Sequence, residues 1–147
     1  MKKILLFCLM AITLVGCSKD EEPTEQTFFV NVYHYQSEST NSAKRLAEQT
    51  WVSLHRDNGR GVGRVDALNG VIYDEVGAEL PLKATSPSNS GANTFENIPN
   101  GKYVMLILHT GCGGWNFTWE HITVDGSYNH KTVTVTLDCS TGYSDWG

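Results

Sequence analysis

The 147-residue chain predicts an all-β fold, a two-sheet β-sandwich of about seven strands with at most one short helix. Runs of alternating apolar and polar residues recur from residue 27 onward, which is the period of half-buried strands. Turn signals such as Asn-Gly and Asp-Gly separate these runs. No long segment of this region has a helical pattern, so packed sheets are the architecture that can bury its apolar residues.

The first residues predict export. Two lysines precede an apolar stretch of about a dozen residues, whereas a spanning helix needs about 20, so residues 1–16 are interpreted as a cleaved signal. The segment Leu14-Val15-Gly16-Cys17 resembles the lipobox of bacterial lipoproteins, which implies that Cys17 is acylated and anchors the chain to a membrane. Residues 17–26 are acidic and contain a proline, which is typical of a tether. Residues 27–147 are then the folded domain.

The residue after the cysteine bears on the membrane in which the lipid lies. The position after Cys17 is Ser18, whereas an aspartate there would resemble an inner-membrane retention signal. We therefore expect the lipid to lie in the outer membrane. The acidic run that follows also resembles the signal by which one group of Gram-negative bacteria sends lipoproteins to the cell surface. Surface exposure is therefore expected, with a periplasm-facing anchor as the alternative.

Charge limits the kinds of partner. Loss of the two signal lysines leaves nine basic residues against sixteen acidic ones, a formal charge of −7 for the mature chain. Phosphate binding requires clustered cations, so the composition argues against nucleic acid as a partner. The length of the remaining chain suits one domain with one core.

The first predicted strand covers residues 28–35, with Phe28, Val30, Val32 and His34 on one face. Residues 37–50 contain the only helix-forming run, and we interpret them as a loop with at most two helical turns. Further strands are expected at residues 51–55, 62–67 and 71–75. Residues 84–93 are rich in Ser, Asn, Pro and Gly, which predicts a long surface loop.

The second half of the chain contains the most apolar strand. Residues 103–109 are apolar on both faces, which predicts a central strand. The segments 115–124 and 131–137 flank a turn at Asp125-Gly126, and this pattern predicts a terminal hairpin.

Two cysteines remain in the mature chain once Cys8 leaves with the signal and Cys17 is acylated. Cys112 and Cys139 are therefore expected to form a disulfide in the oxidising exterior. A metal-binding or nucleophilic role for Cys112 is the alternative.

A local motif carries a family resemblance. The segment from Thr94 to Val104 contains an aromatic residue, an Ile-Pro-Asn-Gly turn and Tyr103 opening the next strand. In this it resembles the transthyretin-like, carboxypeptidase-regulatory-type sandwich, a member of the wider group of immunoglobulin-like folds. Trp51 to Gly59 is similar to the early strand and turn of that family. The resemblance implies an accessory, adhesive or structural module, and it transfers no active site.

Motifs for catalysis are weak. The run Gly59-Arg60-Gly61-Val62-Gly63-Arg64 follows no buried parallel strand and opens no helix, as a phosphate-binding loop would require. The five histidines contain no His-x-His or Glu-x-x-His pair. There is no Gly-x-Ser-x-Gly elbow and no distinctive carboxylate pair. We therefore expect no metal, no cofactor and no enzyme activity, while a catalytic site assembled only by the fold stays a third reading.

Aromatic residues near the C-terminus are the candidate binding residues: Trp115, Trp119, Tyr143 and Trp146, with Phe117 among them. Exposed rings stack on sugars or anchor protein partners. The alternative is that Trp115 and Trp119 belong to the core, while Tyr143 and Trp146 lie exposed or docked on the body. The leading hypothesis is a non-catalytic module for a glycan or an envelope protein. The runner-up is a subunit of a surface assembly such as a fimbria.

Overall fold

The computed structural model describes residues 24–35, 44–110, 112–126, 132–142 and 144–147. The predicted signal, the predicted lipid attachment site Cys17 and most of the predicted tether lie outside the described residues, and so does Tyr143. The first strand begins at Glu25, two residues before the predicted start of the domain.

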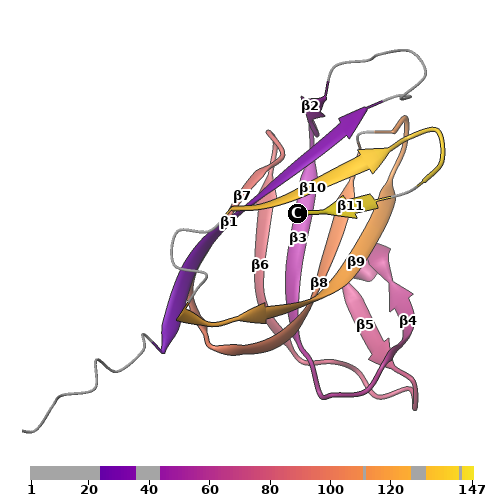
Figure 1. The fold of residues 1–147 in the computed structure, drawn as a ribbon. Coiled ribbons are helices and arrows are strands. Elements are labelled where there is room, and N and C mark those ends of the chain that lie inside the picture. Colours follow the sequence, from indigo (N-terminus) through magenta and orange to yellow (C-terminus); the bar gives the residue numbers. More distant parts are fainter. Residues whose placement is uncertain (1–23, 36–43, 111, 127–131, 143) are drawn as a thin grey trace, which may run out of the picture.

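Two sheets face each other and form a β-sandwich, as expected (Figure 1). The first sheet has the order β11-β10-β1-β2, and β7 also pairs with β1. Its strands are β1 (Glu25–Tyr35), β2 (Arg45–Leu46), β7 (Ala92–Pro99), β10 (Thr132–Asp138) and β11 (Ser144–Trp146). The second sheet has the order β6-β3-β8-β9. Its strands are β6 (Leu82–Ser88), β3 (Thr50–Arg56), β8 (Gly101–His109) and β9 (Asn116–Val124).

A small third unit lies on the outer face of the second sheet. It is the hairpin of β4 (Val62–Asp66) and β5 (Val71–Asp74), whose connection contains the 3₁₀ turn η2 (Ala67–Asn69). Gly70 ends η2 with φ of 65°, a left-handed conformation that residues with a Cβ rarely adopt. This hairpin makes the outer face of the second sheet partly buried (Figure 1).

The main core fills the space between the two sheets. On β1 the buried face consists of Phe28, Val30 and Val32, as the alternation predicts. On the opposite sheet β3 contributes Val52 and Leu54. The Phe28 and Phe95 rings stack with their centroids 5.3 Å apart, which joins β1 to β7 inside this core.

The Ile98–Tyr103 motif turns the chain from the first sheet into the second. Gly101 has φ of 156°, and a Cβ there would lie 2.7 Å from the Arg56 guanidinium. The Tyr103 hydroxyl donates to the Pro99 carbonyl over 2.6 Å, so the turn is closed by its own strand. The geometry explains why glycine and tyrosine both occur in this motif.

The central strand is confirmed, since β8 lies between β3 and β9. Its two faces bury different cores. Met105 and Ile107 point into the sandwich, whereas Val104 and Leu106 form a second cluster with Ile72 and Leu80 beneath the hairpin. This is why β8 is apolar on both faces.

Several sequence predictions are wrong. Residues 84–93 are not a loop, because β6 occupies residues 82–88 and pairs with β3 at the sheet edge, where Pro87 needs no partner for its missing N–H. The predicted terminal hairpin does not form: β9 pairs with β8, while β10 pairs in parallel with β1 in the other sheet. In the segment predicted as a loop with at most two helical turns, residues 44–50 contain β2 and a bend, and residues 37–43 lie outside the described residues. Eleven strands are present among the described residues, four more than expected: the predicted strands at 62–67 and 71–75 form as β4 and β5, whereas β2, β6, β7 and β11 were not predicted.

The Cys112–Cys139 disulfide is confirmed. Cys112 follows β8 of the second sheet and Cys139 follows β10 of the first, so the bond joins the sheets at one end of the sandwich.

Candidate functional site

An apolar row crosses all four strands of the second sheet on its outer face. Pro87 of β6 pairs with Trp51 of β3, Trp51 pairs with Leu108 of β8, and Leu108 pairs with Phe117 of β9. Residues directly opposite each other on neighbouring strands project from the same face. These four residues are called the apolar row below. Trp51 is 48% exposed and Phe117 is 51% exposed. The hairpin therefore leaves the apolar row uncovered, whereas it covers the neighbouring residues of the second cluster.

The hairpin borders the apolar row and shapes two hollows beside it. One, of about 330 Å³, is bounded by Trp51, Leu82 and Thr85. The other, of about 380 Å³, is bounded by Trp115 and Phe117. Ala67, Leu68 and Leu108 line both hollows, so the η2 turn stands between them. Leu68 is 78% exposed and Trp115 is 55% exposed.

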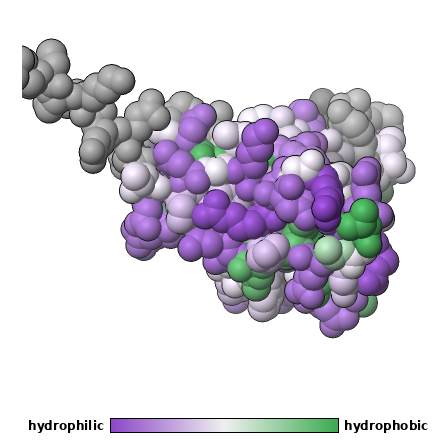
Figure 2. Space-filling model, turned by 90° about the horizontal axis from the view of Figure 1, so that it is seen from below, coloured by the Kyte–Doolittle hydropathy of each residue, from purple (hydrophilic) through white to green (hydrophobic). Residues whose placement is uncertain are grey.

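Figure 2 shows the molecule from below the view of Figure 1, with its hydrophobic residues gathered in a few spots among hydrophilic ones. Large exposed apolar groups that lie together commonly mark a binding surface, whereas scattered ones need no explanation. Five such side chains border the two hollows: Trp51, Leu68, Leu82, Trp115 and Phe117.

Polar groups at the hollows are held by local bonds. The Asp66 carboxylate accepts from the Asn69 side chain over 3.0 Å and caps η2 through the Asn69 backbone N–H. The Arg64 guanidinium lies 3.9 Å from the centre of the Tyr73 ring, a cation–π contact along the hairpin. These contacts orient the carboxylate and the guanidinium at the rim of the second hollow.

Asp74 anchors the base of the hairpin. Its buried carboxylate accepts from the Asn58 amide over 2.9 Å, from Arg60 over 3.2 Å, and from the backbone N–H groups of Val76 and Ala78 over 3.0 and 2.8 Å. The Asn58 bond is the largest of several effects that lower the pKa of this carboxyl. The arginine-containing run of the sequence is thus bonded to β5 rather than arranged around an anion site, and both its arginines have partners.

A buried polar pair lies beneath the first hollow. The His55 Nδ1 bonds to the Leu80 carbonyl over 3.2 Å, and because a carbonyl only accepts, Nδ1 carries the proton. His55 Nε2 then accepts from the Ser53 hydroxyl over 3.1 Å. Burial is the main cause that lowers the pKa of His55. A serine bonded to a neutral histidine is the arrangement of an activated nucleophile, but both residues are about 1% exposed, so here the pair serves to satisfy two buried polar groups.

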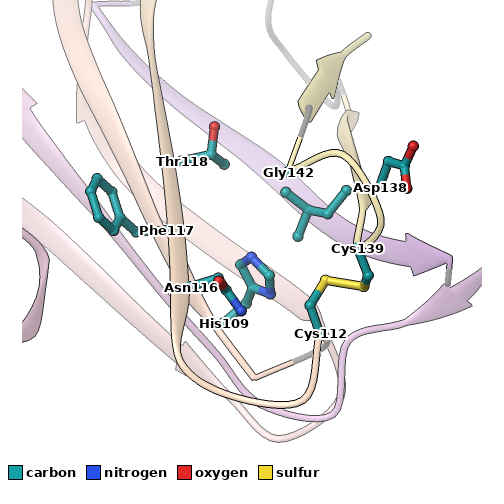
Figure 3. A pocket seen from close by; sticks show the side chains of 9 residues that line it. His109, Cys112, Asn116, Phe117, Thr118, Asp138, Cys139 and Gly142 are labelled. Carbon is teal, nitrogen blue, oxygen red and sulfur yellow. A yellow bond between two sulfur atoms is a disulfide. The ribbon is translucent and has the colours of Figure 1, made fainter. Parts of the chain in front are cut away.

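A smaller cavity of about 90 Å³ lies at the disulfide, inside the sandwich end (Figure 3). Its lining includes His109, Asn116 and both cysteines. Figure 3 shows the Phe117 ring on the opposite side of β9 from His109 and the disulfide. Phe117 of the apolar row also lines this cavity, although its ring lies on the other side of the strand from His109. Burial, together with the nearby His34, lowers the pKa of His109 to about 4.

In the part of the chain that the structure describes, no three His, Cys, Asp or Glu side chains come together as a metal site. Cys112 is held in the disulfide, which leaves the alternative roles proposed for its thiol without support. Among the same residues, no helix is long and apolar enough to cross a bilayer.

The candidate binding residues separate in the structure. Trp115 is exposed beside Phe117, so the core alternative is wrong for Trp115. Trp119 is half-buried against the second core, and Trp146 is half-buried against the main core. Tyr143 lies outside the described residues.

Sequence reasoning missed Trp51, Leu68 and Leu82. Trp51 had a usable signal: it alternates with Val52 and Leu54, so it falls on the face of Ser53 and His55. A tryptophan on the polar face of an alternating strand is a candidate for exposure. Leu68 had no such signal, because its position depends on where the hairpin packs.

No family model matches the chain, and no curated protein matches it. A crystal structure from Pseudomonas aeruginosa, described as a candidate carbohydrate-binding protein, is similar in fold. It is 17% identical, with a TM-score of 0.46 over 79% of this chain and 90% of that chain.

Proposed function

We propose that this chain is a non-catalytic glycan-binding module of the cell envelope, and that the apolar row with Trp115 is its binding surface. The observation that carries the proposal is the grouping of Trp51, Trp115 and Phe117, each about half exposed, around two open hollows. Flat rings bind the apolar faces of sugars, and polar groups at the rim bind their hydroxyls.

Electrical neutrality of the site supports a sugar over a charged partner. The charged side chains that line the two hollows are Arg64 and Asp66, which offset each other. The mature chain is acidic overall, so nucleic acid is disfavoured. An uncharged, hydroxyl-rich ligand matches both facts.

The cellular setting is part of the same proposal. A lipid on Cys17 would hold the domain at the outer membrane through an acidic tether, with the sandwich facing the exterior of the cell and the periplasm-facing orientation as the alternative. The Ile-Pro-Asn-Gly turn closed by Tyr103 supports placing the domain among transthyretin-like sandwiches. At the cell surface a glycan-binding module would encounter polysaccharides directly.

A glycan array tests the function. The full chain in detergent micelles is applied to the array beside Trp51→Ala, Trp115→Ala and Phe29→Ala. Phe29 is a matched control, because it is an aromatic residue 40% exposed on β1 of the other sheet. We expect the parent and Phe29→Ala to bind the same glycans and the other two variants to lose most of the signal. Failure of the parent to bind any glycan on the array would overturn the proposal.

A further inference from the structure

The spacing of the apolar row bears on the form of the ligand. Trp51 and Phe117 are separated by one strand, β8, and both pair directly with Leu108. Neighbouring strands lie about 4.8 Å apart, so the two aromatic positions are about 10 Å apart across the sheet. The leucine between them, Leu108, is half-buried.

An extended β-1,4-linked hexose chain has the same spacing. Each sugar is turned over relative to the next, so every second sugar presents the same face to one side, and the repeat of two sugars is about as long as two strand spacings. Rings at Trp51 and Phe117 therefore match sugars one and three of such a chain. An α-1,4-linked chain curves and does not keep this spacing.

The two hollows support the same arrangement. They lie on either side of the η2 turn and share Leu68 and Leu108, so a ligand that uses both must continue past these residues. One hollow contains Trp51, and the other contains Phe117 and Trp115. The arrangement is that of two neighbouring subsites that share one border.

Resting on the proposed glycan-binding function, we infer that the ligand is a neutral, extended β-1,4-linked glycan of at least three sugars, which lies across the strands from Trp51 to Phe117. The neutrality of the ligand is inferred from the charged residues that line the hollows, since Arg64 contacts Tyr73 and Asp66 caps η2. Neither side chain is arranged as a counter-ion for an acidic sugar. The glycan chain would run perpendicular to the strands, because the apolar row crosses the strands in that direction.

Chain length is the measurement that tests this inference. Cellobiose, cellotriose and cellohexaose are titrated into the full chain in detergent micelles by calorimetry, with maltohexaose and oligogalacturonate as linkage and charge controls. We expect cellotriose and cellohexaose to bind at least about tenfold more tightly than cellobiose, since they reach both rings. Maltohexaose and oligogalacturonate should bind at least about tenfold more weakly than cellohexaose.

Single variants test the two subsites. Trp51→Ala and Phe117→Ala should each abolish the gain from cellobiose to cellohexaose, while Phe29→Ala should retain it. Melting curves check that every variant is folded.

The outcomes separate this inference from the function on which it rests. Equal binding of cellobiose and cellohexaose, or a Phe117→Ala variant with the full chain-length gain, would overturn the two-subsite ligand and leave glycan binding intact. A preference for maltohexaose or oligogalacturonate would do the same. Failure of the parent to bind any glycan on the array would overturn both.

Discussion

Phe117 and Trp119 lie two residues apart on the same face of β9, yet only Trp119 is packed. Trp119 pairs across the sheet with Leu106 and joins the second core beneath the hairpin, whereas Phe117 pairs with Leu108 at the uncovered row. The Trp119 ring also meets His121 edge-on, with centroids 5.8 Å apart. The edge of the hairpin therefore divides one strand face into a structural part and an accessible part.

This division of the strand face predicts that two truncations change the free energy of unfolding by different amounts. Trp119→Ala should lower the free energy of unfolding by about 2 to 4 kcal/mol, because it opens a cavity in the second core. Phe117→Ala should change it by only about 0.5 kcal/mol, as surface substitutions do. Urea unfolding of the two variants beside the parent measures both values. Equal losses would show that Phe117 is part of the core.

The disulfide should contribute substantially to stability. Replacing both Cys112 and Cys139 by Ala should cost about 3 to 4 kcal/mol, because the bond closes a loop with a sequence separation of 27. Chemical unfolding with and without reductant provides the measurement, and the double variant is its own control because reductant should not affect it further. An unfolding free energy equal to that of the oxidised parent would contradict the prediction.

His109 should make the domain sensitive to mild acid. Its pKa is about 4 in the folded chain and near 6.5 when unfolded, so between these values the unfolded chain binds more protons. The contribution of the neutral His109 imidazole to the free energy of unfolding is therefore fully present above about pH 6.5. It declines by about 3 kcal/mol in total as the pH falls toward 4.

Melting curves of the parent and His109→Gln from pH 7 to pH 4 measure this contribution. Gln removes the titration and keeps a polar side chain of similar size. A steeper loss of stability in the parent supports the prediction, and identical profiles would contradict it.

Asp74 should control the order of the hairpin. Asp74→Asn removes the charge that accepts four hydrogen bonds at the base of β5, so the hairpin should open more often. Hydrogen exchange of the β4 and β5 amides should accelerate by about tenfold, while β8 amides stay protected. In the parent the same loss should occur only in strong acid, because the folded pKa lies below its ordinary value of 3.8. Unchanged exchange in the hairpin would exclude this role.

Acylation at Cys17 is the remaining prediction. Cys17→Ala should abolish incorporation of a labelled fatty acid and leave the signal uncleaved by lipoprotein signal peptidase, because this thiol is the only acceptor at the lipobox-like segment. Metabolic labelling measures incorporation, and Cys139→Ala serves as a control that should retain the label. Lipid in the Cys17→Ala protein would contradict the lipoprotein proposal.

Local patterns were sufficient for much of the fold. The alternation of Phe28, Val30 and Val32 correctly assigned the buried face of β1, and the doubly apolar run of β8 correctly predicted a central strand. The two remaining cysteines correctly predicted a disulfide. The first two predictions depend on which face of a strand a residue occupies, which neighbouring positions reveal. The disulfide depends only on a count of the cysteines in the sequence.

Only the tertiary structure decided which strands pair and which aromatic residues stay exposed. Strand β10 carries the pattern of a hairpin partner for β9, yet it pairs with β1, because several partners can bury the same alternating face. Trp51 and Phe117 come together only because β8 lies between their strands, and Trp119 is covered only because the hairpin folds onto it. The sequence by itself determined the faces of the strands, whereas long-range packing determined the site, since exposure depends on segments distant along the chain.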